Sequence, residues 1–261
     1  FIKLVEKMKK NNVENILNEP EIRENKRLVD ETIQRLLPEK HSIHEINLLY
    51  QMMKDYPSRP AKSLRSSVCL LTCQAYGGTI DKALITASSL DLFQNWILIH
   101  DDVEDQSELR RGGPALHHKY TIPLAINAGD ALHGKMWSFL YNNRDILDNE
   151  TTLLVINEFL NMLNETTEGQ HMELSWVHEN QWNIKQDDYL TMCKKKTAWY
   201  TCITPCRLGN LIATNTDLNK NDFVNFGEDL GIAFQIRDDI LNLIAGTKYG
   251  KESAGDLIEG K

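Results

Sequence analysis

Proline and glycine are scarce in this chain of 261 residues, with 7 and 14 copies, and they gather in short breaks between apolar runs. The sequence therefore has no Pro/Gly-rich linker, and no internal domain boundary is expected. Residues 1–261 are expected to form a single domain. Because the chain stops abruptly at Gly260-Lys261, we expect that domain to lack its natural C-terminal end. No run approaches the roughly 18 apolar residues of a membrane span, which predicts a soluble protein.

Cysteine and positive charge are also in short supply. The five Cys residues form no paired framework and follow no signal peptide, which indicates a reducing, cytoplasmic setting. The net charge is -8, with 29 Lys and Arg residues against 37 Asp and Glu residues. This balance excludes a broad binding surface for nucleic acid. An anionic ligand must then be held by local groups of basic residues or by metal ions.

Apolar residues recur at helical spacing along almost the whole chain, whereas sustained alternation with a period of two is absent. The pattern predicts an all-α fold, built as a single antiparallel helical bundle around a large central cavity. We expect helices over residues 25–36, 41–54, 62–76, 81–104, 122–141, 151–176, 186–213 and 220–244.

Two acidic clusters each follow an apolar helical run. Residues 101–105 read DDVED, and Asp101 and Asp105 fall one helical turn apart on the same face. Carboxylate oxygens at this spacing suit Mg²⁺, although an isolated acidic run is more often a solvated helix end. A second pair, Asp238 and Asp239, favours the metal site over the solvated helix end. Two such clusters facing one another across a cavity mouth could hold several Mg²⁺ ions against one diphosphate.

Basic residues lie close to the acidic clusters in sequence. Lys62 and Arg65 share one helical face, and Arg110 and Arg111 directly follow the first acidic cluster. Guanidinium forks and ammonium charges both bind phosphate oxygens. The alternative is ordinary surface ion pairing, which is common and contributes little to stability. For Arg110, Arg111 and Lys196 the residues alone leave the choice open.

Taken in order, these motifs resemble those of the trans-isoprenyl diphosphate synthases, also called polyprenyl synthetases, from about Tyr56 to Lys261. Residues 101–105 resemble the family's first aspartate-rich motif, and Lys62 and Arg65 its GGKRxRP segment. Further matches are Asn127-Ala128-Gly129-Asp130, Gly169-Gln170, Asp188-Tyr189-Leu190, Lys196-Thr197, Gln235 with Asp238-Asp239, Gly250-Lys251 and Gly260-Lys261.

Three features depart from the family pattern. Pro60, Ala61 and Ser63 replace the usual Gly-Gly and first Arg of the basic segment, Asn242 replaces the last carboxylate of the second acidic motif, and the chain ends where the family usually continues. Asn242 keeps an oxygen but loses a charge, so Asp238 is the residue of the second cluster that we expect to bind metal.

The resemblance implies an isoprenoid-synthase-like fold and a short-chain enzyme, such as a farnesyl or geranylgeranyl diphosphate synthase. It would condense isopentenyl diphosphate with an allylic diphosphate by Mg²⁺-assisted ionisation, condensation and proton elimination. It further implies three Mg²⁺ per active site, a homodimer, and a C15 to C20 product with geranylgeranyl diphosphate favoured.

The resemblance also implies roles for individual residues. The metal ligands would be Asp101, Asp102, Asp105 and Asp238, and these would share the catalytic role with Lys196, Thr197 and Gln235. The substrate-binding residues would be Lys62, Arg65, Gln94, Arg110, Arg111, Lys196, Lys251 and Lys261. Trp96 and Ile97, shortly before the first acidic cluster, would limit product length.

Three other readings of the sequence stay open. A class I terpene cyclase shares a helical fold and an acidic motif, but needs no isopentenyl diphosphate site. A di-iron carboxylate bundle would use an ExxH motif such as Glu168 with His171, but it requires a second such motif, which the sequence lacks. A non-catalytic subunit of a heteromeric synthase is the third, and the two complete aspartate pairs argue against it.

Overall fold

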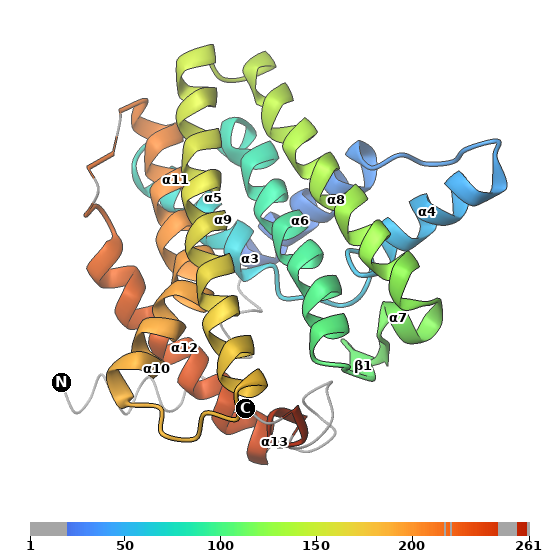
Figure 1. Cartoon of the computed structure of the whole chain (residues 1–261). Coiled ribbons are helices and arrows are strands. Elements are labelled where there is room, and N and C mark those ends of the chain that lie inside the picture. The colour runs from blue at the N-terminus through green and yellow to red at the C-terminus, as the bar shows by residue number, and fades with distance from the viewer. Residues whose placement is uncertain (1–19, 217, 220, 245–254, 260–261) are drawn as a thin grey trace.

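The computed structural model describes residues 20–216, 218–219, 221–244 and 255–259. In this part of the chain every element is helical except one hairpin with two residues in each strand, which confirms the all-α bundle (Figure 1). None of the helices in these ranges is both long and apolar enough to cross a membrane.

Seven of the expected helices are present with shifted ends, the expected helix 186–213 is divided, and α7 and α13 were not expected. The α-helices are α3 Pro20–Leu36, α4 His44–Asp55, α5 Leu64–Ala75, α6 Ile80–Glu104, α7 Leu116–Lys119, α8 Ile122–Asn142, α9 Asn149–His178, α10 Gln186–Cys193, α11 Thr204–Thr214, α12 Val224–Ile244 and α13 Gly255–Glu259. Two other helical segments are the 3-10 helix η1 Asn143–Asp145 and the π-helix η2 Lys194–Ile203.

Helix α6 lies in the middle of the bundle and packs against α3, α5, α8 and α11 (Figure 1). Its buried residues lie all around the helix, as expected for an element surrounded by others. Leu90, Phe93 and Ile99 supply its large apolar contacts, while Ala87 and Ser88 let neighbouring helices approach closely. The C-terminal end of α6, which carries the first acidic cluster, is therefore held firmly.

Residues 186–213 do not form the single uniform helix that was expected. Helix α10 runs into the π-helix η2, and α11 continues from it. A π-helix has hydrogen bonds between residues i and i+5 and a wider turn than an α-helix. Such segments are rare in proteins, and many of those that occur lie at functional sites. Lys196 and Thr197 lie in this segment, so the departure changes how both side chains are presented.

A short hairpin follows α6, where the sequence indicated only a break. Strand β1 Leu109–Arg110 pairs antiparallel with β2 Gly113–Pro114. The two loop residues, Arg111 and Gly112, have φ values of 50° and 77°. Positive φ at both loop positions is typical of the tight turns that favour glycine and match the twist of paired strands.

Candidate active site

A cavity of about 1280 Å³ opens among the C-terminal ends of α6 and α9, the π-helix η2 and α12. Asp101 and Asp105 line it from α6, and Asp238 and Asp239 line it from α12. The sequence predicted that the two acidic clusters would face one cavity, and the structure places them so.

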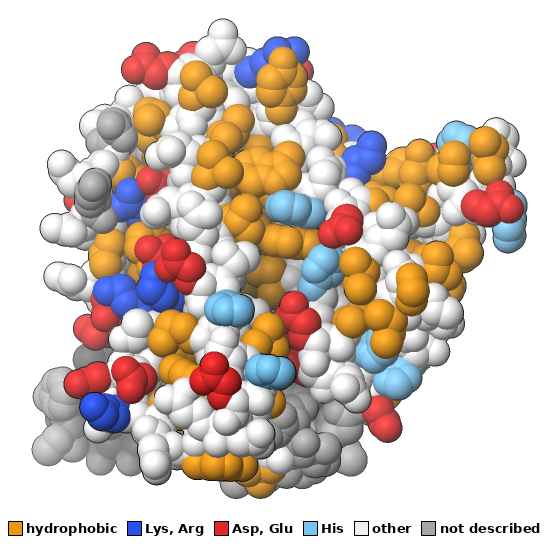
Figure 2. Space-filling view, in the orientation of Figure 1, with side chains coloured by type: hydrophobic (Ala, Val, Ile, Leu, Met, Phe, Trp, Pro, Cys, Tyr) orange, Lys and Arg blue, Asp and Glu red, His pale blue; other side chains and the backbone are white. Residues whose placement is uncertain are grey.

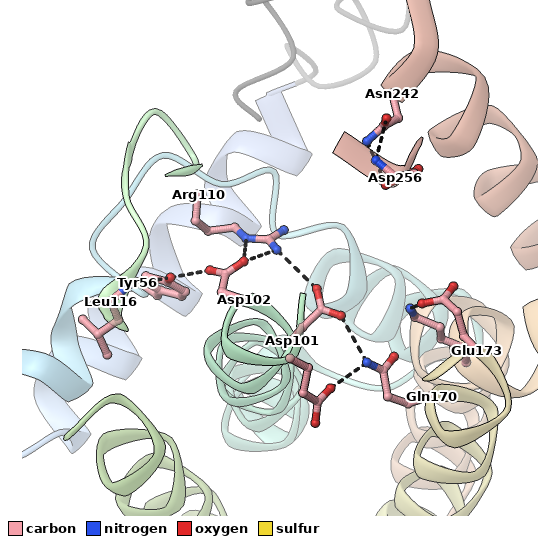
Figure 3. Close-up of polar contacts among 11 residues, drawn as sticks. Tyr56, Asp101, Asp102, Arg110, Leu116, Gln170, Glu173, Asn242 and Asp256 are labelled. Atoms are coloured by element: carbon pink, nitrogen blue, oxygen red, sulfur yellow. Dashed lines mark hydrogen bonds and ion pairs between the residues drawn. The ribbon is translucent and has the colours of Figure 1, made fainter. Parts of the chain in front are cut away.

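The first aspartate pair is divided between the cavity and the interior (Figure 3). Asp102 is fully buried and accepts hydrogen bonds from the Tyr56 hydroxyl and from Arg110, whose Nε lies 2.8 Å from Asp102 Oδ1. Arg110 Nη2 also donates to Asp101 Oδ2 over 3.2 Å. Asp101 lines the cavity, whereas Asp102 is not among its lining residues, and metal binding by both stays a prediction.

Burial and neighbouring charges determine the protonation states of Tyr56 and Arg110. Burial, aided by the Asp102 carboxylate, raises the pKa of Tyr56 well above its usual value, so the hydroxyl remains a donor. Burial alone would lower the pKa of Arg110, but the carboxylates of Asp102 and Asp101 outweigh it and raise that pKa. The result is a satisfied interior ion pair with a guanidinium at the cavity wall.

Gln170 of α9 joins the cavity-facing part of this cluster. Its Nε2 donates to Glu104 Oε2 over 2.7 Å and to Asp101 Oδ1 over 3.4 Å (Figure 3). Gln170 belongs to the Gly-Gln match found in the sequence. The amide therefore links α9 to the acidic end of α6.

Both members of the second aspartate pair line the cavity. Asp239 accepts hydrogen bonds from the Tyr189 hydroxyl over 2.5 Å and from Gln235 Nε2 over 2.7 Å. The Gln235 amide oxygen in turn accepts a hydrogen bond from the Thr197 hydroxyl. These bonds tie η2, α10 and α12 together. Asp238 lines the same cavity wall.

Lys196 extends along the cavity wall to an ion pair with Glu173 of α9. The side chains are 18% and 12% exposed, so water screens the pair only partly. Glu173 was not among the predicted site residues. Its position one helical turn after Gln170, on the same face of α9, is the signal that could have found it.

A basic group occupies the wall beside α5. Arg65 is buried, donates from Nη2 to Thr201 Oγ1 over 2.7 Å, and lies 4.1 Å over the Tyr200 ring. Arg111 donates to Asn95 Oδ1 over 2.9 Å. Burial lowers the pKa of Arg111. Arg65, Arg111 and the predicted Gln94 all line the cavity.

Asp91 was missed by the sequence reasoning. It is buried near Arg65 and Arg111, and burial raises the pKa of its carboxyl group. An acidic residue between Leu90 and Leu92 of a long predicted helix was the available signal.

One predicted substrate residue lies away from the cavity, and two others are not described. Lys62 is exposed and is not among the cavity-lining residues. Lys251 and Lys261 lie outside the described residues. Asn242, the departure from the family's second motif, exchanges hydrogen bonds with Asp256 of α13, and Asp256 lines the cavity (Figure 3).

The residues predicted to limit product length, Trp96 and Ile97, both line the cavity. The Trp96 ring stacks on His133 of α8 with centroids 3.9 Å apart and an interplanar angle of 6°, and it meets Phe93 edge-on at 5.5 Å. These contacts from two sides hold the indole ring in place.

The donors at the cavity mouth fit a hard divalent cation, because they are carboxylate oxygens. Within the described ranges, however, no three His, Cys, Asp or Glu side chains are spaced to hold a metal ion by themselves. Further oxygen ligands would have to come from water or from a bound anion.

Comparison with known proteins agrees with the fold and the motifs. A model of the Polyprenyl synthetase family matches residues 46–261. The chain is 34% identical over 218 residues to the geranylgeranyl diphosphate synthase of Sulfolobus acidocaldarius. That match covers 83% of this chain and 65% of the relative, so the chain spans slightly less than two thirds of the relative's length.

Solved structures show the same architecture. The geranylgeranyl pyrophosphate synthetase of Pyrococcus horikoshii is 32% identical with a TM-score of 0.79, and the match covers 90% of this chain and 69% of that one. The geranylgeranyl pyrophosphate synthase of Corynebacterium glutamicum, which was crystallised with isoprenyl diphosphate and magnesium, is 24% identical with a TM-score of 0.82. That match covers 92% of this chain and 74% of the other, and it shows a shared fold.

Proposed function

We propose, given that the chain belongs to the polyprenyl synthetase family, that it is a trans-prenyltransferase joining isopentenyl diphosphate to an allylic diphosphate. One observation carries the proposal. Acidic residues from α6 and α12 line the same cavity as a set of cations, namely Arg65, Arg110, Arg111 and Lys196. In a chain of net charge -8, this concentration of cations beside carboxylates supports a diphosphate site.

Asp101 and Asp105 on one wall and Asp238 on the other would hold the metal ions, which we propose to be three Mg²⁺. Bound Mg²⁺ would neutralise charge on the departing pyrophosphate. Because no three protein carboxylates are spaced to hold an ion alone in the described ranges, diphosphate oxygens would complete the coordination. Asp102 would act indirectly, by holding the Arg110 guanidinium at the wall.

The remaining residues would bind the allylic substrate and stabilise the charge that forms when it ionises. Arg110 and Lys196 would bind its diphosphate. The hydroxyl of Thr197 and the amide of Gln235 are already fixed by a mutual hydrogen bond, so their dipoles need little reorganisation. Apolar walls supplied by Trp96, Ile97 and their neighbours would keep water from the allylic cation.

Isopentenyl diphosphate would bind beside α5, where Arg65, Arg111 and Gln94 line the cavity. Lys62, Lys251 and Lys261 stay part of the proposal as further phosphate contacts. Orientation of the isopentenyl double bond toward the allylic cation would supply much of the rate. The released pyrophosphate can accept the final proton, so the reaction requires no side-chain base.

Product length is proposed to be C15 to C20, with geranylgeranyl diphosphate favoured. The stacked indole of Trp96, with Ile97 beside it, is large enough to end the cavity below Asp101. The names of the relatives agree with this range without fixing the product of this chain.

We also propose a homodimer in the cytoplasm. Large apolar side chains are exposed along α8 and α9, including Ile122, Leu124, Ile126, Leu153 and Leu160, and Figure 2 shows apolar side chains gathered over this face of the molecule. A second copy packed on this face would remove them from water.

The test is product analysis with the purified chain. Isopentenyl diphosphate and Mg²⁺ are supplied with dimethylallyl, geranyl or farnesyl diphosphate in turn, and dephosphorylated products are separated by chromatography. We expect linear C15 to C20 alcohols and no product without Mg²⁺. A cyclic hydrocarbon formed from a single prenyl diphosphate would instead identify a terpene cyclase. Activity that appears only after addition of a second subunit would assign the chain a non-catalytic role.

A further inference from the structure

The hairpin of β1 and β2 carries two cavity arginines that reach in different directions. Arg110 extends to Asp102 at the end of α6, and Arg111 extends to Asn95, about two turns earlier on the same helix. Arg111 itself occupies the turn, with a φ of 50°. Any displacement of this short hairpin would therefore move both guanidinium groups together.

Arg59, just after α4, holds the hairpin from outside the cavity. Its Nη1 donates to the carbonyl oxygen of Arg110 over 2.7 Å, and its Nη2 donates to that of Pro114 over 2.8 Å. One planar guanidinium thus bonds both strands. The fit is close, because a Cβ added at Gly113 would lie 3.2 Å from the Arg59 guanidinium.

Arg59 is itself fixed on two sides. Its Nε donates to Asp55 Oδ1 over 2.8 Å, and the guanidinium lies 4.6 Å over the Tyr56 ring. The Arg59 and Asp55 side chains are only 13% and 10% exposed, so the pair is better shielded than a surface ion pair. Lys119 donates to the other Asp55 oxygen over 2.6 Å. Neither Arg59 nor Asp55 lines the main cavity.

We propose that Arg59 is a positioning residue that holds the β1–β2 hairpin so that Arg110 and Arg111 present their guanidinium groups to two diphosphates at once. The inference rests on the proposed function for its substrates, but its geometry concerns this chain alone. Lysine cannot replace Arg59, because an ammonium group lacks the planar fork that bonds two carbonyls and a carboxylate together.

The test compares Arg59→Gln and Arg59→Lys with a matched control, Lys195→Gln. The Lys195→Gln substitution also removes two ion pairs, with Glu165 at 2.8 Å and with Glu168 at 2.6 Å. Lys195 does not line the cavity and does not contact the hairpin. Steady-state kinetics would give kcat and both KM values, and calorimetry would give the affinity for inorganic pyrophosphate. For Arg59→Gln we expect both KM values to rise about 10-fold, as for loss of charge-assisted hydrogen bonds, with a smaller change in kcat.

Arg59→Lys should recover little of this loss, while Lys195→Gln should keep wild-type KM values. Asp55→Asn, which leaves the two hydrogen bonds from Arg59 to the backbone carbonyls intact, should give an intermediate rise in both KM values. It keeps the test valid if Arg59→Gln folds poorly.

Unchanged KM values and pyrophosphate affinity in the Arg59 variants, beside an active wild type, would overturn the inference and leave the proposed function standing. A wild type that makes no prenyl product but binds pyrophosphate more tightly than Arg59→Gln would reject the function and keep the positioning role. A wild type that neither turns over nor binds pyrophosphate would overturn both.

Discussion

The second carboxylate of each aspartate pair accepts a hydrogen bond from a tyrosine. Tyr56 donates to Asp102 and Tyr189 donates to Asp239. Burial raises the pKa of both phenols well above the usual value, so both remain donors at neutral pH. A carboxylate withdrawn from water needs such donors, because an unpaired buried charge is costly. In the first pair Tyr56 fixes the buried Asp102 while Asp101 lines the cavity, and in the second pair Tyr189 fixes Asp239, which lines the cavity together with Asp238.

Tyr56→Phe tests this arrangement at the scale of one hydroxyl group. The substitution keeps the ring under Arg59. It removes the hydroxyl that donates a hydrogen bond to Asp102 and accepts one from the Leu116 N–H. We expect the free energy of unfolding to fall by roughly 1–3 kcal/mol, the cost of unsatisfied buried polar groups, and kcat/KM to fall with it. Urea denaturation and steady-state kinetics would measure the two effects.

Tyr141→Phe is the matched control for that substitution. Its hydroxyl accepts a hydrogen bond from Arg144 on the surface, and the side chain is 54% exposed, so its loss should change stability by less than about 0.5 kcal/mol. Equal stability losses in the two variants would contradict the role given to Tyr56.

At the scale of elements, the π-helix η2 and helix α9 meet at Gly169. A Cβ at this position would lie 2.2 Å from the Lys196 backbone nitrogen, so the two elements could not keep their present separation. The same segment carries Thr197, Tyr200 and Thr201, of which the last two hold Arg65. The close contact at Gly169 thus affects the positions of both Lys196 and Arg65.

Gly169→Ala should therefore destabilise the protein by about 1–3 kcal/mol through overpacking, and should reduce turnover because Lys196 and Thr197 move. Gly134→Ala is the control, since a Cβ there meets nothing within 4 Å and alanine favours a helix by up to about 1 kcal/mol. Thermal denaturation and product assays would compare them. A Gly169→Ala variant as stable and active as wild type would refute the close-packing account.

The sequence predicted the helices well, because apolar periodicity is a local property that survives tertiary packing. It did not predict the π-helix, since the wider turn of residues 194–203 depends on contacts with α9 and α12, which lie far away in sequence. The β1–β2 hairpin was missed for a related reason. Arg111 at positive φ carries no strong turn signal, and the strands contain two residues each.

On the scale of the whole molecule, the bundle brings together residues that the chain keeps far apart. The sequence indicated correctly that Asp101 and Asp238 would share a cavity, because each follows an apolar helical run. It could not show that Asp102 would turn inward to Arg110 and Tyr56, or that Glu173 would pair with Lys196. Those outcomes depend on which face of each helix is buried.

The central claim is that the two acidic walls bind divalent cations jointly with a diphosphate. Binding of Mn²⁺, followed by electron paramagnetic resonance with and without inorganic pyrophosphate, tests it most directly. Wild type should bind Mn²⁺ weakly alone and at least about 10-fold more tightly with pyrophosphate, because the anion supplies the missing oxygen ligands. Asp101→Ala and Asp238→Ala should each remove that gain, and Asp229→Ala, an exposed α12 position outside the cavity, should keep it. The same pyrophosphate-dependent gain in the Asp101 and Asp238 variants as in wild type would contradict the account.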